Sequence, residues 1–296
     1  MILRGVSLSP YTTIGIGGIG SYFALPKDLE ELRYVLDFAK DRGLSIFPLG
    51  RGANTIFGDF DGLVVSMKNF RELRVKERDN LFYVWAGSGV PLKELVRIAL
   101  KEDLDGMYKL AGFPATVGGA VAMNAGAFGY EISQHLKRVI FLDWDGQIQT
   151  ANREELTFAY RSSPFPELGI VVNAEFVFPK ADYRTKQEYS VIRSRRKATQ
   201  PINLPTCGST FKNPPGEYAG RLLEKVGMRG YRVGGVSFSE KHANFLVNLG
   251  GGTYEQVVRI LEEAKKRVYE EFGIELQEEV RLVESGSPYG WKVCGT

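Results

Sequence analysis

The stretch between positions 111 and 129 is built almost entirely from small residues. It carries no charge, few side chains larger than alanine, and glycine at positions 112, 118, 119, 126 and 129. Backbone with so little side-chain bulk can approach a ligand closely, and successive N–H groups form concave sites for anions. The stretch therefore predicts a site for a phosphate-bearing cofactor; a tightly packed glycine turn is the alternative.

A second loop of the same kind lies about sixty residues earlier in the chain. Residues 44–49 predict a short buried strand, and the glycine-containing loop 50–55 follows it directly. A strand followed by such a loop is a common way to hold phosphates with backbone amides. Two loops suit a ligand with two phosphates, so the pair favours a dinucleotide over a mononucleotide.

A third glycine motif does not support the same chemistry. Residues 15–20 match G-x-G-x-x-G letter for letter. The Rossmann interpretation needs a strand before this motif and a helix after it. Here Ser9 and Pro10 precede the motif, and an extended stretch ending at Pro26 follows it. We therefore expect no Rossmann fold.

Length and charge limit the classes of partner. A chain of 296 residues can form two or three domains, and its 44% hydrophobic and 25% charged content is typical of globular proteins. The net charge of +3 is too small to indicate a nucleic-acid partner. One basic cluster, at residues 193–197, is either a solvated helix face or a clamp for an anionic substrate.

Cysteine and histidine are scarce. The two cysteines, Cys207 and Cys294, do not form a disulfide framework, which favours the reducing cytoplasm. No apolar run has membrane-spanning length and no signal sequence is recognisable, so we expect a cytoplasmic protein without a membrane partner. With only His135 and His242, and no C-x-x-C or G-x-S-x-G motif, neither a metal site nor a serine triad is supported.

Local patterns predict the elements that position these loops. Asp28 and Glu31 have capping-box spacing at the start of a helix that Gly43 ends, and Pro91 opens another helix. Residues 62–67, 81–86 and 169–178 predict strands, and 138–144 with 147–151 predict a hairpin. Further on, we expect helices at 183–200 and 217–226, a long helix between Thr253 and Gly273, and strands at 244–248 and 274–283.

Taken in order, these segments resemble the UDP-N-acetylenolpyruvoylglucosamine reductases, and the match spans nearly the whole chain. The segments that carry the resemblance are Thr13 with Gly17 and Gly18, the loop 49–55, the stretch 111–129, residues 160–165, residues 200–201, residues 207–214, residues 242–248 and residues 279–281. The small-residue stretch combined with the sequence Gly-Ser-Thr-Phe-Lys-Asn-Pro is a specific signature. The interval between Arg161 and Ser209 is short, as in the shorter subclass of that family.

The resemblance implies an α+β protein of three units. Two would form an FAD-binding fold of the vanillyl-alcohol oxidase or p-cresol methylhydroxylase type, at residues 1–68 and 69–200. The third would be an α+β substrate-binding domain at residues 201–283, followed by a tail at 284–296. The family reduces the enolpyruvyl group of a UDP-sugar to UDP-N-acetylmuramate, a peptidoglycan precursor, with non-covalent FAD and with NADPH as hydride donor. We expect a monomer whose partner is the small-molecule UDP-sugar.

The resemblance also assigns residues. Arg161 and Glu279 match the pair that stabilises an enol-like intermediate, and Ser209 matches the proton donor. The positions that match the substrate site are Tyr160, Arg196, Lys212, Asn213 and His242. Those that match the cofactor site are Leu49, Gly50, Arg51, Gly52, Ala53, Asn54, Thr55, Gly112, Pro114, Ala115, Thr116, Gly118, Gly119, Ala120, Gly126 and Arg281. The family usually has a smaller residue where this chain has Arg51, Ala53 and Ala115.

Two other classes of function fit part of the pattern. One is another FAD-dependent oxidoreductase or oxidase of the same cofactor fold, which would oxidise alcohols with oxygen; the motif that contains Ser209 argues against it. The other is a non-catalytic module that binds flavin or a UDP-sugar without nicotinamide-dependent turnover. Without the resemblance, Ser209 would be a structural turn residue, and Arg161 and Glu279 would be an ordinary ion pair or surface charges.

Overall fold

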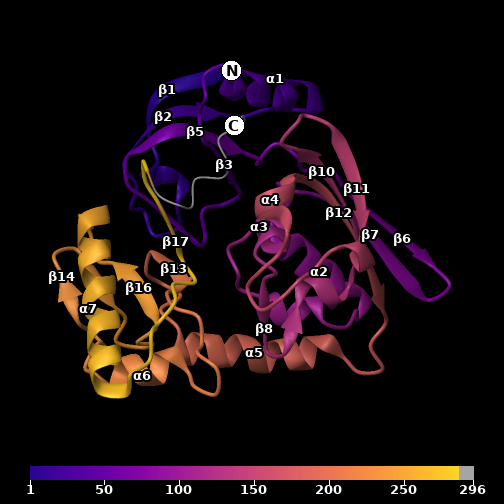
Figure 1. The fold of residues 1–296 in the computed structure, drawn as a ribbon. Helices are drawn as coiled ribbons and strands as arrows, with labels where there is room; N and C mark the ends of the chain where they lie inside the picture. Colours follow the sequence, from indigo (N-terminus) through magenta and orange to yellow (C-terminus); the bar gives the residue numbers. More distant parts are fainter. Residues whose placement is uncertain (287–296) are drawn as a thin grey trace.

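A computed structural model describes residues 1–286 of the chain. Three sheets form the centres of three units, and Figure 1 shows them around a central region that helix α5 crosses below. The units correspond to separate hydrophobic clusters, although segments cross between them. The predicted tail begins at residue 284, so most of it, together with Cys294, lies outside the described residues.

The first unit is a four-stranded sheet in the order β1 (Ile2–Ser7), β2 (Ile19–Ala24), β5 (Phe60–Ser66) and β3 (Ile46–Leu49). Strands β2 and β3 run parallel to β5, and β1 runs antiparallel to β2. Helix α1 (Leu29–Lys40) packs its apolar face on this sheet. Asp28 Oδ1 accepts a hydrogen bond from the N–H of Glu31 at 2.9 Å, which confirms the predicted helix start.

The G-x-G-x-x-G motif leads directly into strand β2, so the rejection of a Rossmann fold is confirmed. Its glycines have a packing role instead. A Cβ atom on Gly17 would lie 2.4 Å from the backbone nitrogen of Ser9. A Cβ on Gly18 would lie 2.5 Å from the carbonyl carbon of Gly58. The chain crosses itself here at a separation that only glycine allows.

The second unit is an antiparallel sheet in the order β11 (Ile148–Asn152), β10 (Leu136–Asp143), β12 (Gly169–Pro179), β7 (Leu81–Gly87) and β6 (Leu73–Arg78). The predicted hairpin of β10 and β11 is confirmed. The helices α2 (Leu92–Glu102), α3 (Val117–Ala122) and α4 (Phe165–Leu168) accompany the sheet, and α5 (Thr185–Thr199) leaves it toward the third unit (Figure 1). Small paired strands, β8 (Gly126–Ala127) and β9 (Tyr130–Glu131), form a tight hairpin.

The small-residue stretch holds more regular structure than its composition suggested. It contains helix α3, whose buried side chains include Val117, Ala120 and Val121. The helix packs closely because its residues are small: a Cβ atom on Gly118 would lie 2.5 Å from Cβ of Ser88. Small residues therefore allow close approach of the backbone to β7 as well as to any ligand.

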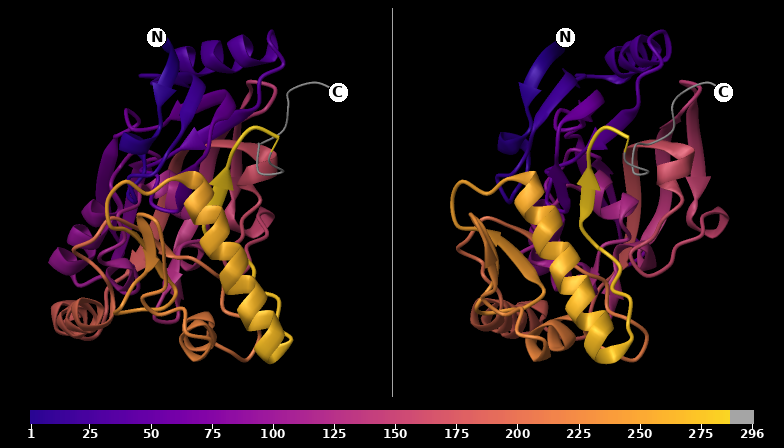
Figure 2. Two further views of the ribbon diagram at one scale, coloured as in Figure 1. Left: turned by 90° about the vertical axis from the view of Figure 1, so that its left-hand side faces the viewer. Right: turned by 60° about the vertical axis from the view of Figure 1, so that its left-hand side comes forward.

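The third unit has a sheet in the order β13 (Thr206–Ser209), β16 (Phe245–Asn248), β15 (Val236–Phe238) and β14 (Arg232–Val233). Helices α6 (Ala219–Lys225) and α7 (Tyr254–Phe272) pack against it (Figure 2). Thr253 and Gln256 form the predicted capping box of α7, and Gly273 ends this helix with a φ of 65°.

The predicted strand at residues 274–283 is wrong over most of its length. Only β17 (Arg281–Val283) is a strand, and it pairs in parallel with β4 (Thr55–Phe57) of the first unit. The alternating apolar residues before it do face the core of the third unit, with Leu276 and Val280 buried. No continuous partner strand lies beside them among residues 1–286. The alternation of apolar and polar residues here therefore reflects burial against the core and not pairing in a sheet. As a result, the end of the chain leaves the third unit and joins the first (Figure 2).

Candidate active site

Arg161 and Glu279 form an ion pair although 118 residues separate them in the chain. Nε of Arg161 lies 2.6 Å from Oε1 of Glu279, and both side chains are largely buried. Nη2 of Arg161 also donates to the carbonyl oxygen of Gly126 at 2.8 Å. The backbone of Arg161 has a φ of 54°, in the left-handed region that non-glycine residues seldom adopt. The guanidinium is thus held by two partners in a fixed orientation.

The backbone of Glu279 lies beside the strand that carries Ser209. The N–H of Glu279 donates to the carbonyl oxygen of Thr210 at 2.8 Å, and Thr210 follows Ser209 directly. Burial raises the pKa of Glu279, while Arg161 and then Lys212 act in the opposite direction. The structure therefore brings Arg161, Glu279 and the Ser209 segment to one place.

His242 lies in a polar corner of the third unit, and burial lowers its pKa. Its Nδ1 lies 3.2 Å from the backbone N–H of Asn244, which can only donate. Nδ1 must therefore accept, which places the ring proton of the neutral imidazole on Nε2. A Cβ atom on Gly220 would lie 3.1 Å from Cε1 of His242, so helix α6 approaches the ring closely. Nearby, Oδ1 of Asn213 accepts from the N–H of Ala219 at 3.1 Å, at the start of α6.

Arg196 lies near the carboxyl end of α5 and contacts the small-residue stretch. Its guanidinium lies 4.7 Å from the ring centre of Phe113 and 5.3 Å from that of Phe128. A Cβ atom on Gly112 would lie 3.4 Å from Cδ of Arg196. Burial lowers the pKa of Arg196 to about 10. Nε of Arg196 is buried and has no hydrogen-bond partner among residues 1–286, as expected of a cation that awaits an anionic ligand.

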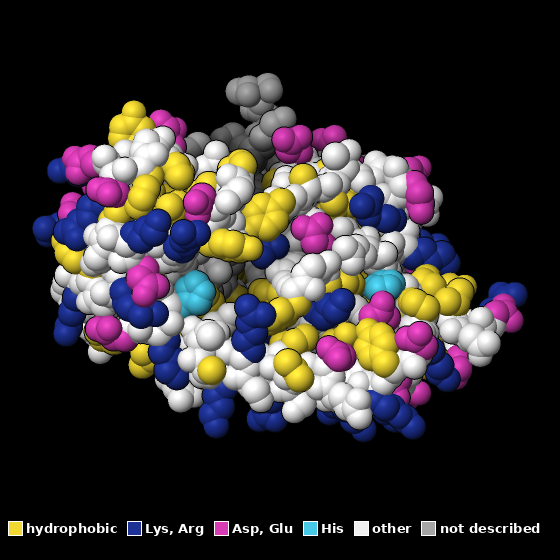
Figure 3. Space-filling view, turned by 90° about the horizontal axis from the view of Figure 1, so that it is seen from below, with side chains coloured by type: hydrophobic (Ala, Val, Ile, Leu, Met, Phe, Trp, Pro, Cys, Tyr) yellow, Lys and Arg dark blue, Asp and Glu magenta, His cyan; other side chains and the backbone are white. Residues whose placement is uncertain are grey.

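Tyr160, also predicted to lie in the substrate site, is 46% exposed, and the guanidinium of Arg161 lies 4.8 Å from its ring centre. Viewed from below, the molecule shows two histidine side chains at its surface, with lysine and arginine side chains between them (Figure 3). The composition of this face is compatible with an anionic ligand.

The two predicted cofactor loops meet. A Cβ atom on Gly50 would lie 2.5 Å from Oγ1 of Thr116 and 3.8 Å from Cα of Gly119. Gly52 has a φ of 63° and lies against the carbonyl of Tyr11. The hydroxyl oxygens of Thr116 and Ser88 are buried without a hydrogen-bond partner in the described part of the chain. The hydroxyl of Thr116 lies where the two glycine loops meet, and a buried hydroxyl without a partner there fits a polar group such as the pyrophosphate of FAD.

Sequence reasoning missed several residues that hold this arrangement. Asn244 bonds both backbone groups of Phe211 through its side chain, at 2.9 and 2.8 Å. Phe113 and Phe128 support Arg196, and Gly220 supports His242. Phe128 carried a signal in the sequence, because a large aromatic residue is unusual within a run of small residues. The other contacts join segments that no local pattern relates.

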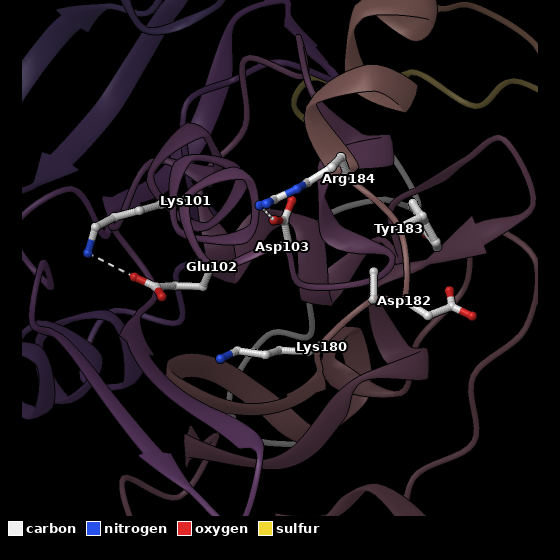
Figure 4. Close-up of a pocket in the computed structure, with 8 residues that line it drawn as sticks. Lys101, Glu102, Asp103, Lys180, Asp182, Tyr183 and Arg184 are labelled. Atoms are coloured by element: carbon white, nitrogen blue, oxygen red, sulfur yellow. Dashed lines mark hydrogen bonds and ion pairs between the residues drawn. The ribbon is translucent and has the colours of Figure 1, made fainter.

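Two surface cavities lie away from the predicted site residues. One, of about 460 Å³, lies between the end of α2 and the start of α5, where Arg184 pairs with Asp103 (Figure 4). The other, of about 400 Å³, lies on the outer face of the five-stranded sheet beside Tyr83 and Trp85. Their charged side chains are mostly paired with one another, so neither cavity resembles a built ligand site.

Other chemistry finds no support in the described residues. Across positions 1–286, no cluster of three histidine, cysteine, aspartate or glutamate side chains could hold a metal ion. None of the helices in this range is both long enough and apolar enough to cross a membrane. Cys207 is a core residue, and burial raises the pKa of its thiol to about 12.

Comparison with known proteins identifies the family. An FAD-binding domain family matches residues 20–152, and the C-terminal domain of UDP-N-acetylenolpyruvoylglucosamine reductase matches residues 200–283. The UDP-N-acetylenolpyruvoylglucosamine reductase of Aquifex aeolicus is 56% identical, over 100% of this chain and 99% of that protein. The protein of the same name from Moorella thermoacetica is 38% identical, over 96% and 94% of the two chains.

The solved structure of the UDP-N-acetylenolpyruvylglucosamine reductase from Thermus caldophilus superposes with a TM-score of 0.79 at 31% identity, covering 95% of this chain and 98% of that one. These likenesses confirm the expected α+β architecture with its FAD-binding fold. The chain therefore belongs to the UDP-N-acetylenolpyruvoylglucosamine reductase family, and it is a flavin-dependent oxidoreductase whose cofactor is FAD and whose reductant is NADPH.

Proposed function

We propose that Arg161, Glu279 and Ser209 are the catalytic residues with which this reductase acts on the enolpyruvyl group of UDP-N-acetylenolpyruvoylglucosamine. The observation that carries the assignment is the buried Arg161–Glu279 pair, whose backbone lies beside the segment of Ser209. The product, UDP-N-acetylmuramate, would enter peptidoglycan synthesis in the cytoplasm, and the enzyme would act as a monomer. The proposed division of the chain is that expected from its sequence, with boundaries at residues 68, 200 and 283.

The two glycine loops would hold the cofactor. Gly50 and Gly119 keep side-chain bulk away from the place where the loops meet, and Thr116 supplies a buried hydroxyl there. Bound FAD would supply the hydride chemistry that connects NADPH to the terminal carbon of the enolpyruvyl group. The residues of the protein would orient the cofactor and the substrate relative to each other. They would also stabilise developing charge on the substrate and supply a proton to it.

Arg161 would stabilise the negative charge that accumulates on the neighbouring carbon and carboxylate of the substrate. Its guanidinium is fixed by Glu279 and by the carbonyl of Gly126 before any substrate binds. Preorganised charge in a largely buried site lowers the barrier more than the same charge in water. Glu279 would hold the guanidinium in place through their ion pair.

Ser209 would deliver the proton that completes the reduction. A serine hydroxyl is a weak acid in water, so its surroundings must favour the alkoxide that remains. Lys212 follows three residues later, and its N–H donates to the carbonyl oxygen of Gln277 at 2.8 Å, which keeps this segment beside Glu279. The ammonium of Lys212 would favour the alkoxide through its charge.

The anionic ends of the substrate would meet cationic and neutral donors. Arg196, with its unpartnered Nε, suits a diphosphate or carboxylate oxygen. His242 can donate from Nε2, and Tyr160, Lys212 and Asn213 would complete the site.

The proposal is tested by following the flavin. The purified protein should be yellow, lose its colour on anaerobic addition of NADPH, and regain it when UDP-N-acetylenolpyruvoylglucosamine is added. Bleaching of the flavin by an alcohol substrate, with colour restored by oxygen and not by the UDP-sugar, would assign the protein to an oxidase reaction instead. If the protein bound flavin but did not respond to NADPH, it would be a binding module without catalytic activity.

A further inference from the structure

Asn54 connects the first cofactor loop to the segment that carries Glu279. Its side-chain Nδ2 donates to the carbonyl oxygen of Glu279 at 2.9 Å, across 225 positions of sequence. Its own carbonyl oxygen accepts from the N–H of Arg281 at 3.0 Å. A backbone carbonyl can only accept, so the side-chain atom that faces Glu279 must be the amide nitrogen. Both bonds therefore have a defined direction.

Glu279 is held from the opposite side as well. Its N–H, and that of Val280 at 3.2 Å, both point to the carbonyl oxygen of Thr210. Thr210 is fully buried, and its hydroxyl accepts from the N–H of Leu246 in β16 at 3.1 Å. The backbone of Glu279 is thus hydrogen-bonded on one side to the third unit and on the other to the predicted cofactor loop of the first unit.

Regular structure contributes little to the placement of Glu279. Residues 274–280 belong to no strand, and β17 begins only at Arg281. Before β17, the isolated bridge between Phe211 and Glu278 fixes the segment to the third unit. The side-chain bond of Asn54 joins Glu279 directly to the loop at residues 50–55, next to the backbone bond between Arg281 and Asn54.

We propose that Asn54 is a positioning residue for catalysis: it ties Glu279 to the cofactor loop, so that binding of the cofactor orders the Arg161–Glu279 pair. This inference rests on the proposed function, because it assumes that the loop holds FAD and that the pair acts on the substrate. It assigns Asn54 a role beyond contact with the cofactor. Since the side-chain amide bonds Glu279, a displacement of the loop would also displace Glu279 and its partner Arg161.

The first test uses Asn54→Asp and Asn54→Ala. Aspartate keeps the shape but sets a carboxylate oxygen against the carbonyl of Glu279, and alanine removes the bond. We expect NADPH to bleach the flavin in both variants within about twofold of the wild-type rate. Reoxidation by the UDP-sugar should slow by about 10- to 100-fold at saturating substrate, the scale of a small misplacement of reacting groups. Its pH profile, which depends on Glu279, should shift.

Asn69→Ala is the matched control. The amide of Asn69 also bonds backbone carbonyls, those of Leu25 and Pro26 at 3.2 Å each, and neither belongs to a predicted cofactor loop or to the segment of Glu279. This variant should leave both rates and the pH profile unchanged. Equal loss of both half-reactions in the Asn54 variants, or loss of flavin alone, would show that Asn54 is only a cofactor contact and would overturn the proposal. Wild-type reoxidation rates would overturn it too.

A second measurement needs no variant that must fold. Amide hydrogen exchange would be measured on the wild-type chain with and without FAD. Exchange at Glu279 and Arg281 should be slower when FAD is bound, because both N–H groups belong to the segment that Asn54 joins to the loop. Unchanged exchange at these two amides would overturn the coupling. If the wild-type protein neither bleached with NADPH nor reacted with the UDP-sugar, the proposed function itself would fail, independently of Asn54.

Discussion

Gly50 and Thr116 bring the two predicted cofactor loops into contact, although one loop follows β3 and the other precedes α3. A Cβ atom at position 50 would lie 2.5 Å from Oγ1 of Thr116. This contact makes one site from two stretches that are about sixty residues apart in the sequence. The glycines of the site consequently divide into those that allow the protein to pack and those that face open space, and substitutions can separate the two groups.

Gly119→Val should weaken FAD binding without unfolding the protein. A Cβ atom at Gly119 would meet nothing closer than Oγ1 of Thr116 at 3.5 Å, an ordinary contact, so added bulk reaches the cofactor's space. We expect at least about a tenfold rise in the FAD dissociation constant, or about 1.4 kcal/mol. Gly118→Ala is the contrast, because its Cβ would meet Ser88 at 2.5 Å; it should lower the free energy of unfolding by about 1–3 kcal/mol. Flavin titration and denaturant melts check both, and full FAD affinity in Gly119→Val would contradict the pyrophosphate assignment.

Glu279→Gln should slow the substrate half-reaction and spare the nicotinamide half-reaction. The substitution removes the ion-pair partner of Arg161, so the guanidinium is no longer fixed where charge develops. Loss of one preorganised group of this kind typically lowers the rate by about 10²- to 10³-fold. Stopped-flow absorbance with NADPH and then with the UDP-sugar separates the two steps. Glu278→Gln, next in sequence but paired with Lys265, serves as the control. Equal losses in both steps would point to damaged flavin binding.

Ser209→Ala should slow reoxidation of the flavin by the UDP-sugar by about 10²- to 10⁴-fold, the usual worth of a positioned proton donor. Ser209→Cys should recover part of this rate, because a thiol is a stronger acid of similar size. Ser237→Ala in the same sheet, whose hydroxyl donates to the carbonyl of Tyr231 at 3.1 Å, should not affect the rate. Rapid-reaction kinetics provide the measurement. A wild-type rate in Ser209→Ala would remove this residue from the mechanism.

Gly220→Ala should raise KM for the UDP-sugar more than it lowers kcat. The new methyl group would stand 3.1 Å from Cε1 of His242 and would force the imidazole to shift. A residue that binds substrate equally in the ground and transition states affects KM alone. We expect about a tenfold increase in KM, corresponding to one displaced hydrogen bond. Steady-state kinetics at varied UDP-sugar concentration test this, and an unchanged KM would place His242 outside the substrate site.

Asp103→Asn should remove part of the acid dependence of stability. The hydrogen bond from Arg184, together with the N–H of Thr185, holds the pKa of Asp103 below its usual value. A carboxyl whose pKa is lower in the folded state stabilises the fold above its unfolded pKa of about 3.9, and this contribution is lost as the pH falls through the folded pKa. The Tm of the variant should therefore lie below that of the wild type at neutral pH, and the two should converge in acid. Parallel Tm curves down to low pH would exclude this role.

Local sequence information predicted most of the elements. The helices α1 and α7 follow from caps and apolar spacing, since those signals lie within a few residues of each other. Helix α5 was predicted from its run of charged residues, and no side-chain cap marks its start. The absence of a helix after the G-x-G-x-x-G motif was also evident from Pro26 and the extended residues before it. The prediction failed at residues 274–280, where alternation reflected burial against the third unit without sheet pairing.

The sequence by itself determined the family resemblance, the two glycine loops and the residue types available for chemistry. It could not determine that Arg161 and Glu279 touch, or that Asn54 bonds the backbone of Glu279, because 118 and 225 residues separate the partners. Such contacts arise only when β17 leaves the third unit and pairs with β4 of the first. Helix and strand propensities depend on residues within a few turns of the chain. Long-range contacts instead depend on which apolar faces of helices and sheets are buried against one another. The tertiary structure therefore decided which of the available residues meet.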